Sequence, residues 1–399
     1  MSKPIHIGLI MQGGRGWLGG VEYIKNIILA LASLPEESRK KFRLSLIVNG
    51  DLEPELLDDV KPHLSQIYRI DDYLAPKNLR NRIYWKINRI LFNAENPRFV
   101  KFLRQQNFDF IFPYWSKTSR GSNFAAAAWI YDFQHKYLPE FFSSDEIQAR
   151  DAEFKNIAKS ASTIVLSSQN AQDDFKKYFP EFAYKTEVLS FKTAVSEIWF
   201  EGNPEQIQLL YNLPDRFFVV SNQFWKHKNH LTLFKALSLL QQRSIYPIVV
   251  CTGHIYDYRQ PSYSDTILQT IHKLGLFPQV FLLGLIPKID QVQLMRRSLA
   301  VLQPSLFEGW STLVENARCL GKPMILSDLA VNLEQNPPNS TFFNRDSPEE
   351  LADILALWWA ECSPGPDLLQ ESIAKLENIS NIRAFGDRFL EIVHKSLIK

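Results

Sequence analysis

The chain has 399 residues, more than a usual single domain, so two domains of about 200 residues each are expected. Hydrophobic residues make up 45% and charged residues 22% of the chain, which is typical of a soluble globular protein. The formal net charge of +2 argues against general nucleic-acid binding, and no apolar run reaches the roughly 18 residues that a transmembrane helix needs.

Short apolar runs alternate with longer helical stretches, the pattern of parallel sheets with crossover helices. The strands expected in the first half are Ile5–Met11, Arg43–Val48, Asp109–Phe112, Ala126–Tyr131, Thr163–Ser167 and Glu187–Ser190. A second series comprises Phe217–Ser221, Ile248–Thr252, Val280–Leu283, Leu299–Gln303 and Pro323–Ser327. The polar turn cluster 200–204 between them suits a hinge. The sequence therefore predicts two consecutive doubly wound α/β domains, 1–200 and 201–381, with a cleft between them.

The cysteines and the first residues of the chain indicate the cellular compartment of the protein. Cys251, Cys319 and Cys362 are widely spaced and form no metal-ligand pattern. An odd number of cysteines fits no complete disulfide framework, so a reducing cytoplasm is expected. The opening segment 1–11 is too short and too soon interrupted for a signal peptide and is expected to form the first strand.

A glycine-rich loop follows the first expected strand. Five of the 16 glycines fall between positions 12 and 22, just before an expected helix. Glycine lets a ligand approach the backbone, and a helix N-terminus favours an anion. The order of the glycines does not match the dinucleotide fingerprint G-x-G-x-x-G. The alternative is a flexible turn between strand and helix.

The stretch 77–104 is strongly basic. It holds eight Lys or Arg residues and one acid, Glu95, a net +8 − 1 = +7. Its isoleucines and Leu91 fall at helical spacing and form an apolar stripe. We favour a domain helix that buries this stripe, and the alternative is a peripheral helix on an anionic membrane surface, on the inner face, near a lipid-linked acceptor.

The most informative segment is 304–328, PSLFEGWSTLVENARCLGKPMILSD. It begins after an expected strand, becomes a helix after Trp310, and ends at the next strand. Gly309 permits close approach of a ligand, and the amides that follow lie at a helix N-terminus, where a phosphate is favoured. Glu308 and Glu315 can accept hydrogen bonds from sugar and ribose hydroxyls. This combination suits a nucleotide-sugar site, whereas the alternative is a structural loop with two solvated glutamates.

This segment resembles the donor-site motif of retaining glycosyltransferases of family 4. The resemblance implies the GT-B fold, in which two Rossmann-like domains face each other across a cleft and a final helix, here about 382–399, packs back onto the first domain. The family usually separates its two glutamates by seven residues, whereas six separate Glu308 from Glu315. The flanking PS, EG, G-x-P and SD remain.

The resemblance also implies an activity. The enzyme would move a hexosyl group from a nucleotide diphosphate sugar, a UDP- or GDP-sugar by expectation, to a hydroxyl of a glycan or lipid-linked acceptor, with retention of the anomeric configuration. No cofactor is implied, and no Asp-x-Asp metal motif occurs. Glu308 would contact the donor sugar as a catalytic residue and Glu315 the ribose. The amides around Ser311, Thr312 and Leu313, together with Lys228, would hold the diphosphate, and Gly309 and Trp310 are further donor-binding residues of this segment.

Further donor-site residues follow from the same resemblance. His135 and, as second choice, Asp132 come after an expected strand, where ligands bind in open α/β sheets, and correspond to the family's sugar-contacting position. The family places an Arg and, five residues later, a Lys at the diphosphate. Lys228 matches the catalytic Lys, Gln223 replaces the Arg, and Lys226 is hypothesised to supply the missing charge. Additional candidates are Gly19, Gly20, Gly253, Leu285 and Ile286.

Two rival interpretations stay open. One is another GT-B class, such as a sugar-nucleotide epimerase or a phosphorylase, against which the segment 304–328 argues. The other is a non-catalytic nucleotide-sugar-binding or complex-assembly protein, supported by Gln223 and the short glutamate spacing. A role in polysaccharide biosynthesis rests on analogy with the family.

Overall fold

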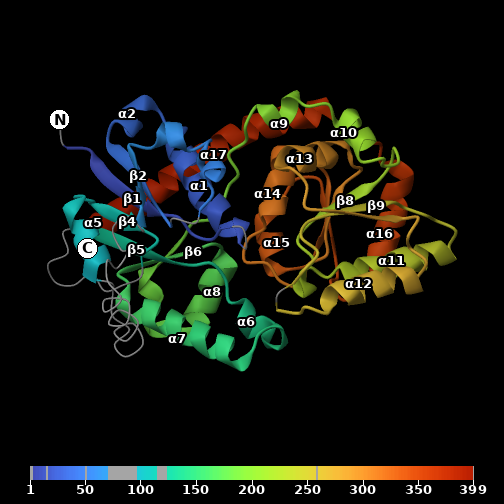
Figure 1. Ribbon diagram of the computed structural model, residues 1–399, viewed down its shortest axis with the longest axis horizontal. Helices are drawn as coiled ribbons and strands as arrows, with labels where there is room; N and C mark the ends of the chain where they lie inside the picture. The colour runs from blue at the N-terminus through green and yellow to red at the C-terminus, as the bar shows by residue number, and fades with distance from the viewer. Residues whose placement is uncertain are drawn as a thin grey trace.

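The computed structural model describes residues 3–14, 17–49, 52–70, 97–114, 124–257 and 259–398. Most of the basic stretch 77–104 lies outside these residues, so only its last part is described, in a helix that begins at Pro97. Figure 1 shows two lobes side by side, the first in blue and green and the second in yellow and orange.

The first lobe is a seven-stranded parallel sheet with the order β3-β2-β1-β4-β5-β6-β7. Its strands are β1 (Ile5–Ile10), β2 (Phe42–Val48), β3 (Gln66–Arg69), β4 (Phe110–Phe112), β5 (Ala125–Ile130), β6 (Thr163–Leu166) and β7 (Thr186–Val188). Its described α-helices are α1 (Leu18–Ala32), α2 (Glu36–Arg39), α5 (Pro97–Gln105), α6 (Gln134–Tyr137), α7 (Ser144–Ser160) and α8 (Gln169–Tyr178). Short 3₁₀ helices are η1 (Pro54–Leu57), η2 (Lys61–His63), η3 (Pro139–Phe141) and η4 (Pro180–Lys185).

The second lobe is a six-stranded parallel sheet with the order β10-β9-β8-β11-β12-β13. Its strands are β8 (Phe218–Ser221), β9 (Val249–Thr252), β10 (Val280–Gly284), β11 (Val301–Gln303), β12 (Met324–Ser327) and β13 (Ser340–Phe343). The helices α9 (Ile198–Glu201) and α10 (Pro204–Leu210) precede it. The remaining helices are η5 (Lys226–Lys228), α11 (His230–Gln242), α12 (Tyr263–Lys273), α13 (Lys288–Arg297), α14 (Thr312–Cys319), α15 (Ala330–Gln335), α16 (Pro348–Glu361) and α17 (Leu368–Ile398).

The two doubly wound α/β sheets confirm the predicted fold class, and their strand orders locate a ligand site. In each sheet the order reverses beside one central strand, between β1 and β4 in the first lobe and between β8 and β11 in the second. Ligands bind at such switch points, outside the carboxyl ends of the strands. The loops after β8 and β11 are those that carry Gln223 and Glu308.

Two strands, β3 and β13, were not expected from the sequence. Both lie at the edge of their sheets. The four residues of β3 are all partly or fully exposed, as are three of the four in β13. Neither strand carries a buried apolar run, whereas β7, an edge strand that was expected, leads directly into the buried Leu189.

The last helix joins the two lobes. It begins at Leu368, earlier than the expected position 382, and Figure 1 shows it in red running from the second lobe to the first. Its far half is part of the first lobe's core, because Phe385 and Phe389 are buried in one hydrophobic cluster with Ile7 of β1. The chain therefore crosses between the lobes both at the segment before α9 and at α17.

Gly386 is required where α17 crosses α1. A Cβ atom at this position would lie 2.8 Å from the carbonyl oxygen of Ala30. Gly→Ala inside a helix ordinarily stabilises by about 1 kcal/mol, whereas overpacking costs about 1–3 kcal/mol. We therefore expect Gly386→Ala to lower the melting temperature measured by calorimetry. A raised melting temperature would show that the helices can separate at no cost.

Candidate active site

A cavity of about 460 Å³ lies between the two lobes, where the loops that follow the switch-point strands meet. The first lobe contributes the start of α1 and the residues after β5, and the second contributes the loops after β8 and β11. The predicted site residues that line it are Gly19, Asp132, Gln223, Lys228, Glu308, Gly309, Trp310, Ser311, Thr312 and Leu313. The predicted residues outside its lining are Gly20, His135, Lys226, Gly253, Leu285, Ile286 and Glu315.

The N-terminus of α14 faces this cavity. Ser311 is its N-cap, and the Ser311 Oγ accepts a hydrogen bond from the backbone N–H of Val314 at 3.2 Å. The side chain of Gln303, the last residue of β11, donates to the same Oγ at 2.6 Å. These bonds fix the start of the helix, and the cavity-lining residues Thr312 and Leu313 belong to its first turn. The positive end of the helix dipole is thus directed at the cavity.

Glu308 and Lys228 form an ion pair in the cavity wall. The Lys228 Nζ lies 2.6 Å from Oε1 of Glu308, and both side chains are mostly buried. The same Oε1 accepts hydrogen bonds from the Ser305 hydroxyl at 2.6 Å and from the Gln303 amide at 2.9 Å. Three donors hold one carboxylate oxygen, so the carboxylate is oriented before any ligand arrives, and the lysine is held beside it.

Asp132, rather than His135, reaches the cavity after β5. Burial raises the pKa of the Asp132 carboxyl, and Arg150, 3.9 Å away, opposes that rise. His135 is 1% exposed and its Nε2 lies 3.0 Å from Oδ1 of Asp151, within the first lobe. Burial lowers the pKa of its ring, and the hydrogen bond with Asp151 opposes that change. The sequence-based role of His135 as a sugar contact therefore does not match its position.

Trp17 covers the glycines at the start of α1. A Cβ atom on Gly20 would lie 2.9 Å from the Trp17 ring and one on Gly19 would lie 3.3 Å from the indole nitrogen. The small residues thus make room for a tryptophan, and Trp17 lines the cavity together with Tyr23 and Trp129. The rings of Tyr23 and Trp129 stack at 4.2 Å. The aromatic wall of the cavity thus combines Trp17 of the glycine-rich loop with Tyr23 of α1 and Trp129 of β5, and the sequence pattern gave no sign of it.

Lys226 and Lys228 point in different directions. They are two residues apart in the short helix η5, a spacing that places them on different sides of the turn. The Lys226 Nζ lies 4.9 Å from the centroid of the Phe141 ring in the first lobe, outside the cavity lining. A different lysine, Lys288 at the start of α13, lines the cavity. The hypothesis that Lys226 replaces the missing Arg is therefore not supported by its position.

The variants Lys226→Ala and Lys228→Ala should consequently differ. Because Lys226 contacts an aromatic ring outside the cavity, we expect its removal to change nucleotide affinity by less than about twofold. Removal of Lys228 should weaken nucleotide affinity about tenfold or more, since hydrogen bonds to charged groups contribute about 1.5–3 kcal/mol. Calorimetric titration of both variants tests this, and equal losses would contradict the assignment.

Three other predicted residues shape the surroundings of the cavity. Gly253 has φ +132°, and a Cβ there would lie 2.2 Å from the carbonyl oxygen of Asn222. Because it has no side chain, Gly253 lets the cavity-lining loop with Asn222 and Gln223 pack closely against its own backbone. Leu285 is 67% exposed, and Ile286 packs against the hydrophobic core beneath the sheet.

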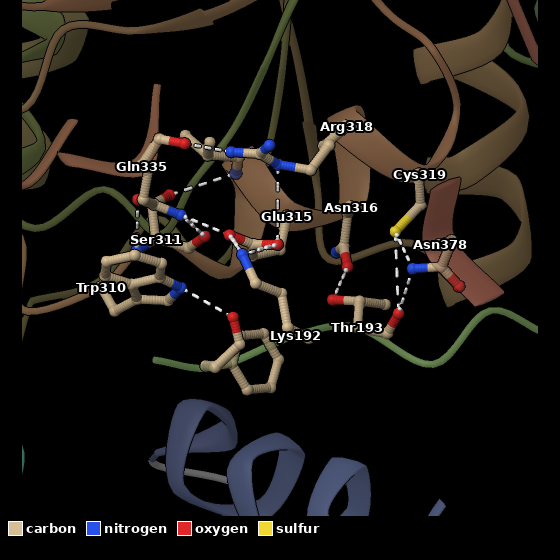
Figure 2. Close-up of polar contacts among 12 residues, drawn as sticks. Lys192, Thr193, Trp310, Ser311, Glu315, Asn316, Arg318, Cys319, Gln335 and Asn378 are labelled. Carbon is tan, nitrogen blue, oxygen red and sulfur yellow. Dashed lines mark hydrogen bonds and ion pairs between the residues drawn. The ribbon is translucent and has the colours of Figure 1, made fainter. Parts of the chain in front are cut away.

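Glu315 and its neighbour Asn316 both contact the segment 192–193 from α14 (Figure 2), but only Asn316 lines the cavity. Consecutive helical residues are about 100° apart around the axis, so the two side chains have different surroundings. Asn316 lines the cavity, whereas the Glu315 side chain is 1% exposed and bonded to other protein groups. Seven residues separate Glu308 from Asn316. Asn316 thus stands at the spacing that the family uses for its second glutamate, a signal that would have identified it.

Comparisons with known proteins agree with this geometry. Residues 204–364 match the family described as glycosyl transferases group 1. No curated protein matches the chain. Among solved structures, the Anabaena protein HepE, crystallised with UDP and glucose, is 17% identical, with a TM-score of 0.58 and coverage of 98% of both chains. A Rickettsia africae glycosyltransferase is 15% identical, with a TM-score of 0.64 and full coverage of both chains.

A third similar structure is sucrose-phosphate synthase from Thermosynechococcus elongatus, 15% identical, with a TM-score of 0.61. The match covers 98% of this chain and 95% of that one. At such identities the likeness concerns the fold, which is the two-domain GT-B fold. Within the described residues no group of three or more His, Cys, Asp or Glu side chains is arranged to hold a metal ion.

Proposed function

We propose that this chain, whose residues 204–364 match the family described as glycosyl transferases group 1, is a glycosyltransferase that moves a hexosyl group from a nucleotide diphosphate sugar to an acceptor hydroxyl with retention of configuration. The observation that carries the proposal is the meeting of three groups in one cavity: the N-terminus of α14, the cation of Lys228 and the carboxylate of Glu308. These are an anion site, a counter-ion for a diphosphate, and an acceptor for sugar hydroxyls.

Each group has a defined task in this reaction. The amides at the start of α14 and Lys228 bind the diphosphate and stabilise the charge that grows on it as it leaves. Glu308 accepts hydrogen bonds from the donor sugar. The bond from the anomeric carbon to the phosphate oxygen breaks, and a bond to the acceptor oxygen forms on the same face. The acceptor proton passes to the departing phosphate, so no side chain has to form a covalent intermediate.

UDP-sugars are the first donors to try, because the Anabaena protein was crystallised with UDP-glucose as well as UDP. GDP-sugars remain the second choice. We propose that transfer needs no metal ion, because the cation of Lys228 and the positive end of α14 face the cavity where the sequence lacks an Arg at Gln223. Activity that survives EDTA supports this point, and activity restored only by a divalent cation contradicts it.

The acceptor binds, in this proposal, against the first lobe. Trp17, which lines the cavity and stacks on the buried Trp129 at 5.7 Å, offers a flat apolar ring against which a sugar can pack. A glycan or a lipid-linked sugar is the acceptor class, and polysaccharide assembly in the cytoplasm is the setting. No helix within the described part of the chain is long and apolar enough to cross a membrane. Peripheral membrane contact through 77–104 stays a hypothesis.

The test is release of nucleoside diphosphate from a panel of UDP-, GDP-, ADP- and dTDP-sugars, with Lys228→Met as control. Slow hydrolysis of one donor, lost in the variant, supports a transferase site and identifies the nucleotide. NMR of the product then reports its anomeric configuration. Binding without release, even with acceptors present, would favour the non-catalytic alternative that Gln223 suggests.

A further inference from the structure

Three consecutive residues of the segment 191–194, which follows β7 and leads to α9, are bonded to the donor-side residues Trp310, Glu315 and Asn316 (Figure 2). We call the segment 191–194 the hinge segment. The Trp310 Nε1 donates to the carbonyl oxygen of Phe191 at 2.9 Å. The Thr193 hydroxyl lies 3.0 Å from Oδ1 of Asn316, to which it donates. Trp310 and Asn316 both line the cavity, so the hinge segment supports two residues of its wall from behind.

An ion pair lies between these two hydrogen bonds. The Lys192 Nζ is 3.2 Å and 3.3 Å from the two carboxylate oxygens of Glu315. Glu315 is 1% exposed, and it also accepts from the Gln335 amide at 3.0 Å and lies 3.8 Å from Nε of Arg318. The Lys192 Nζ also lies 5.4 Å from the centroid of the Trp310 ring. The Lys192 side chain therefore contacts both Trp310 and Glu315.

The hinge segment is also tied to the rest of the molecule. The backbone N–H of Ala194 donates to Oδ1 of Asn26 on α1 at 2.5 Å. The Asn378 amide on α17 donates to the carbonyl oxygen of Thr193 at 2.8 Å. The segment thus connects α14 of the second lobe with α1 of the first and with the helix that crosses between them. A rotation of one lobe against the other has to move this segment.

From this arrangement we infer that Lys192 and Glu315 are a positioning pair for the donor site. Their ion pair holds the hinge segment against α14 and thereby fixes Trp310 and Asn316 in the cavity wall. The inference rests on the proposed function, because the groups positioned are those that face the nucleotide part of the donor. Glu315 acts through Lys192 and has no direct contact with the substrate.

Lys192 can hold the hinge segment against α14 because the charge of Glu315 is buried. A buried carboxylate needs compensating partners, and Lys192 contacts both of its oxygens. When Lys192 is removed, Arg318 and Gln335 still hold Glu315 within α14 and α15, so the second lobe stays folded. The hinge segment, however, loses its anchor between Trp310 and Asn316. A shift of about 1 Å in a binding group can reduce a rate about 100-fold.

The variant to test is Lys192→Met, and the chain offers a matched control. Lys375 also pairs with a glutamate of the segment that joins the lobes, Glu197, at 2.7 Å, and lies 4.2 Å from the Phe200 ring centroid. Lys375→Met therefore removes the same kinds of contact without touching the wall of the cavity. Lys192→Arg keeps the positive charge and should therefore retain the wild-type affinity for the nucleotide sugar.

For Lys192→Met we expect the KM for the nucleotide sugar to rise about tenfold or more, with kcat within about threefold. Lys375→Met should leave KM unchanged, and Lys192→Arg should have a KM close to that of the wild type. A merely structural role for Lys192 would lower the melting temperature and the fraction of active enzyme and leave KM as in the wild type. That result, or equal effects in the two Met variants, would overturn the inference.

A second measurement needs no substrate. Hydrogen exchange of the free protein should be faster over residues 310–316 in Lys192→Met than in the wild type and in Lys375→Met. Unchanged exchange in this region would overturn the positioning role. If the wild type releases no nucleotide from any donor, the proposed function fails, and the exchange result still decides whether Lys192 holds this wall.

Discussion

Glu308→Gln should lower the rate of nucleoside diphosphate release by at least about 100-fold, the size of effect seen when a preorganised polar group is removed from an active site. The substitution keeps the shape of the side chain and an oxygen that Ser305 and Gln303 can still contact. It removes the negative charge beside the donor sugar. It also leaves the Lys228 cation, 13% exposed, without its counter-ion.

The same variant should not bind nucleotide more weakly than the wild type. Lys228 is paired with Glu308 at 2.6 Å in the free protein, and the neutral amide releases it to interact with a diphosphate. A calorimetric titration beside the turnover assay separates the two effects. The control is Asp353→Asn, which breaks the exposed ion pair with Arg243 on the far side of the second lobe. Parallel loss of affinity and turnover would contradict the division of roles between Glu308 and Lys228.

Gly309→Ala should abolish most activity with little change in stability. A Cβ atom on Gly309 would lie 2.8 Å from the carbonyl oxygen of Tyr131 and 2.9 Å from Cβ of Asp132, both in the first lobe. The backbones of the two lobes approach each other so closely here that any side chain holds them apart. Each lobe can fold around an alanine, whereas the closed arrangement that forms the cavity cannot. We expect kcat/KM to fall about 100-fold or more.

Substitution of a second glycine should have the opposite effect, a loss of stability with unchanged activity. Gly275 lies after α12, away from the cavity, with φ +64° and open space around its Cα. Gly275→Ala should lower the melting temperature because an L-residue at this φ is strained by about 1–2 kcal/mol, and it should leave turnover unchanged. Thermal melts and turnover of both variants form one experiment. Normal activity in Gly309→Ala would show that the lobes need not approach as closely as described.

The repeating pattern of apolar runs predicted the fold well because the central parallel strands are buried on both faces. Strands such as β1 and β8 consist almost wholly of buried residues, which the pattern detects directly. The edge strands β3 and β13 were not expected, because their mostly half-exposed residues form no run of buried apolar side chains. The start of α17 was also placed too late, since its first half, with Leu368 and Leu369 exposed, lacks a continuous buried face.

The candidate site was predicted best where a motif and a strand end coincide. Glu308, Lys228 and the start of α14 all follow β8 or β11, and all line the cavity. Direction around a helix was harder to predict, because a shift of one residue turns a side chain by about 100°. Such a shift of one residue separates Asn316, which lines the cavity, from Glu315, which does not.

Contacts between the lobes could not be predicted from a single sequence. Lys192 and Glu315 are 123 positions apart, and no local pattern relates them. The same holds for Glu334 of α15, whose carboxylate accepts hydrogen bonds from the first backbone amides of α8, at 2.7 Å from Gln169 and 2.9 Å from Asn170. Such pairs depend on how the lobes pack, which the spacing of residues along the chain does not reveal.

The most direct test of the central claim, that the cavity between the lobes binds a nucleotide sugar, is calorimetric titration of UDP, GDP, ADP and dTDP into the wild type and Lys228→Ala. We expect one molecule of one of these nucleotides, UDP by first expectation, to bind per chain, and the variant to bind it about tenfold or more weakly. The claim is contradicted if none binds at millimolar concentration to protein that melts cooperatively. It is equally contradicted if binding occurs and the loss of Lys228 leaves it unchanged.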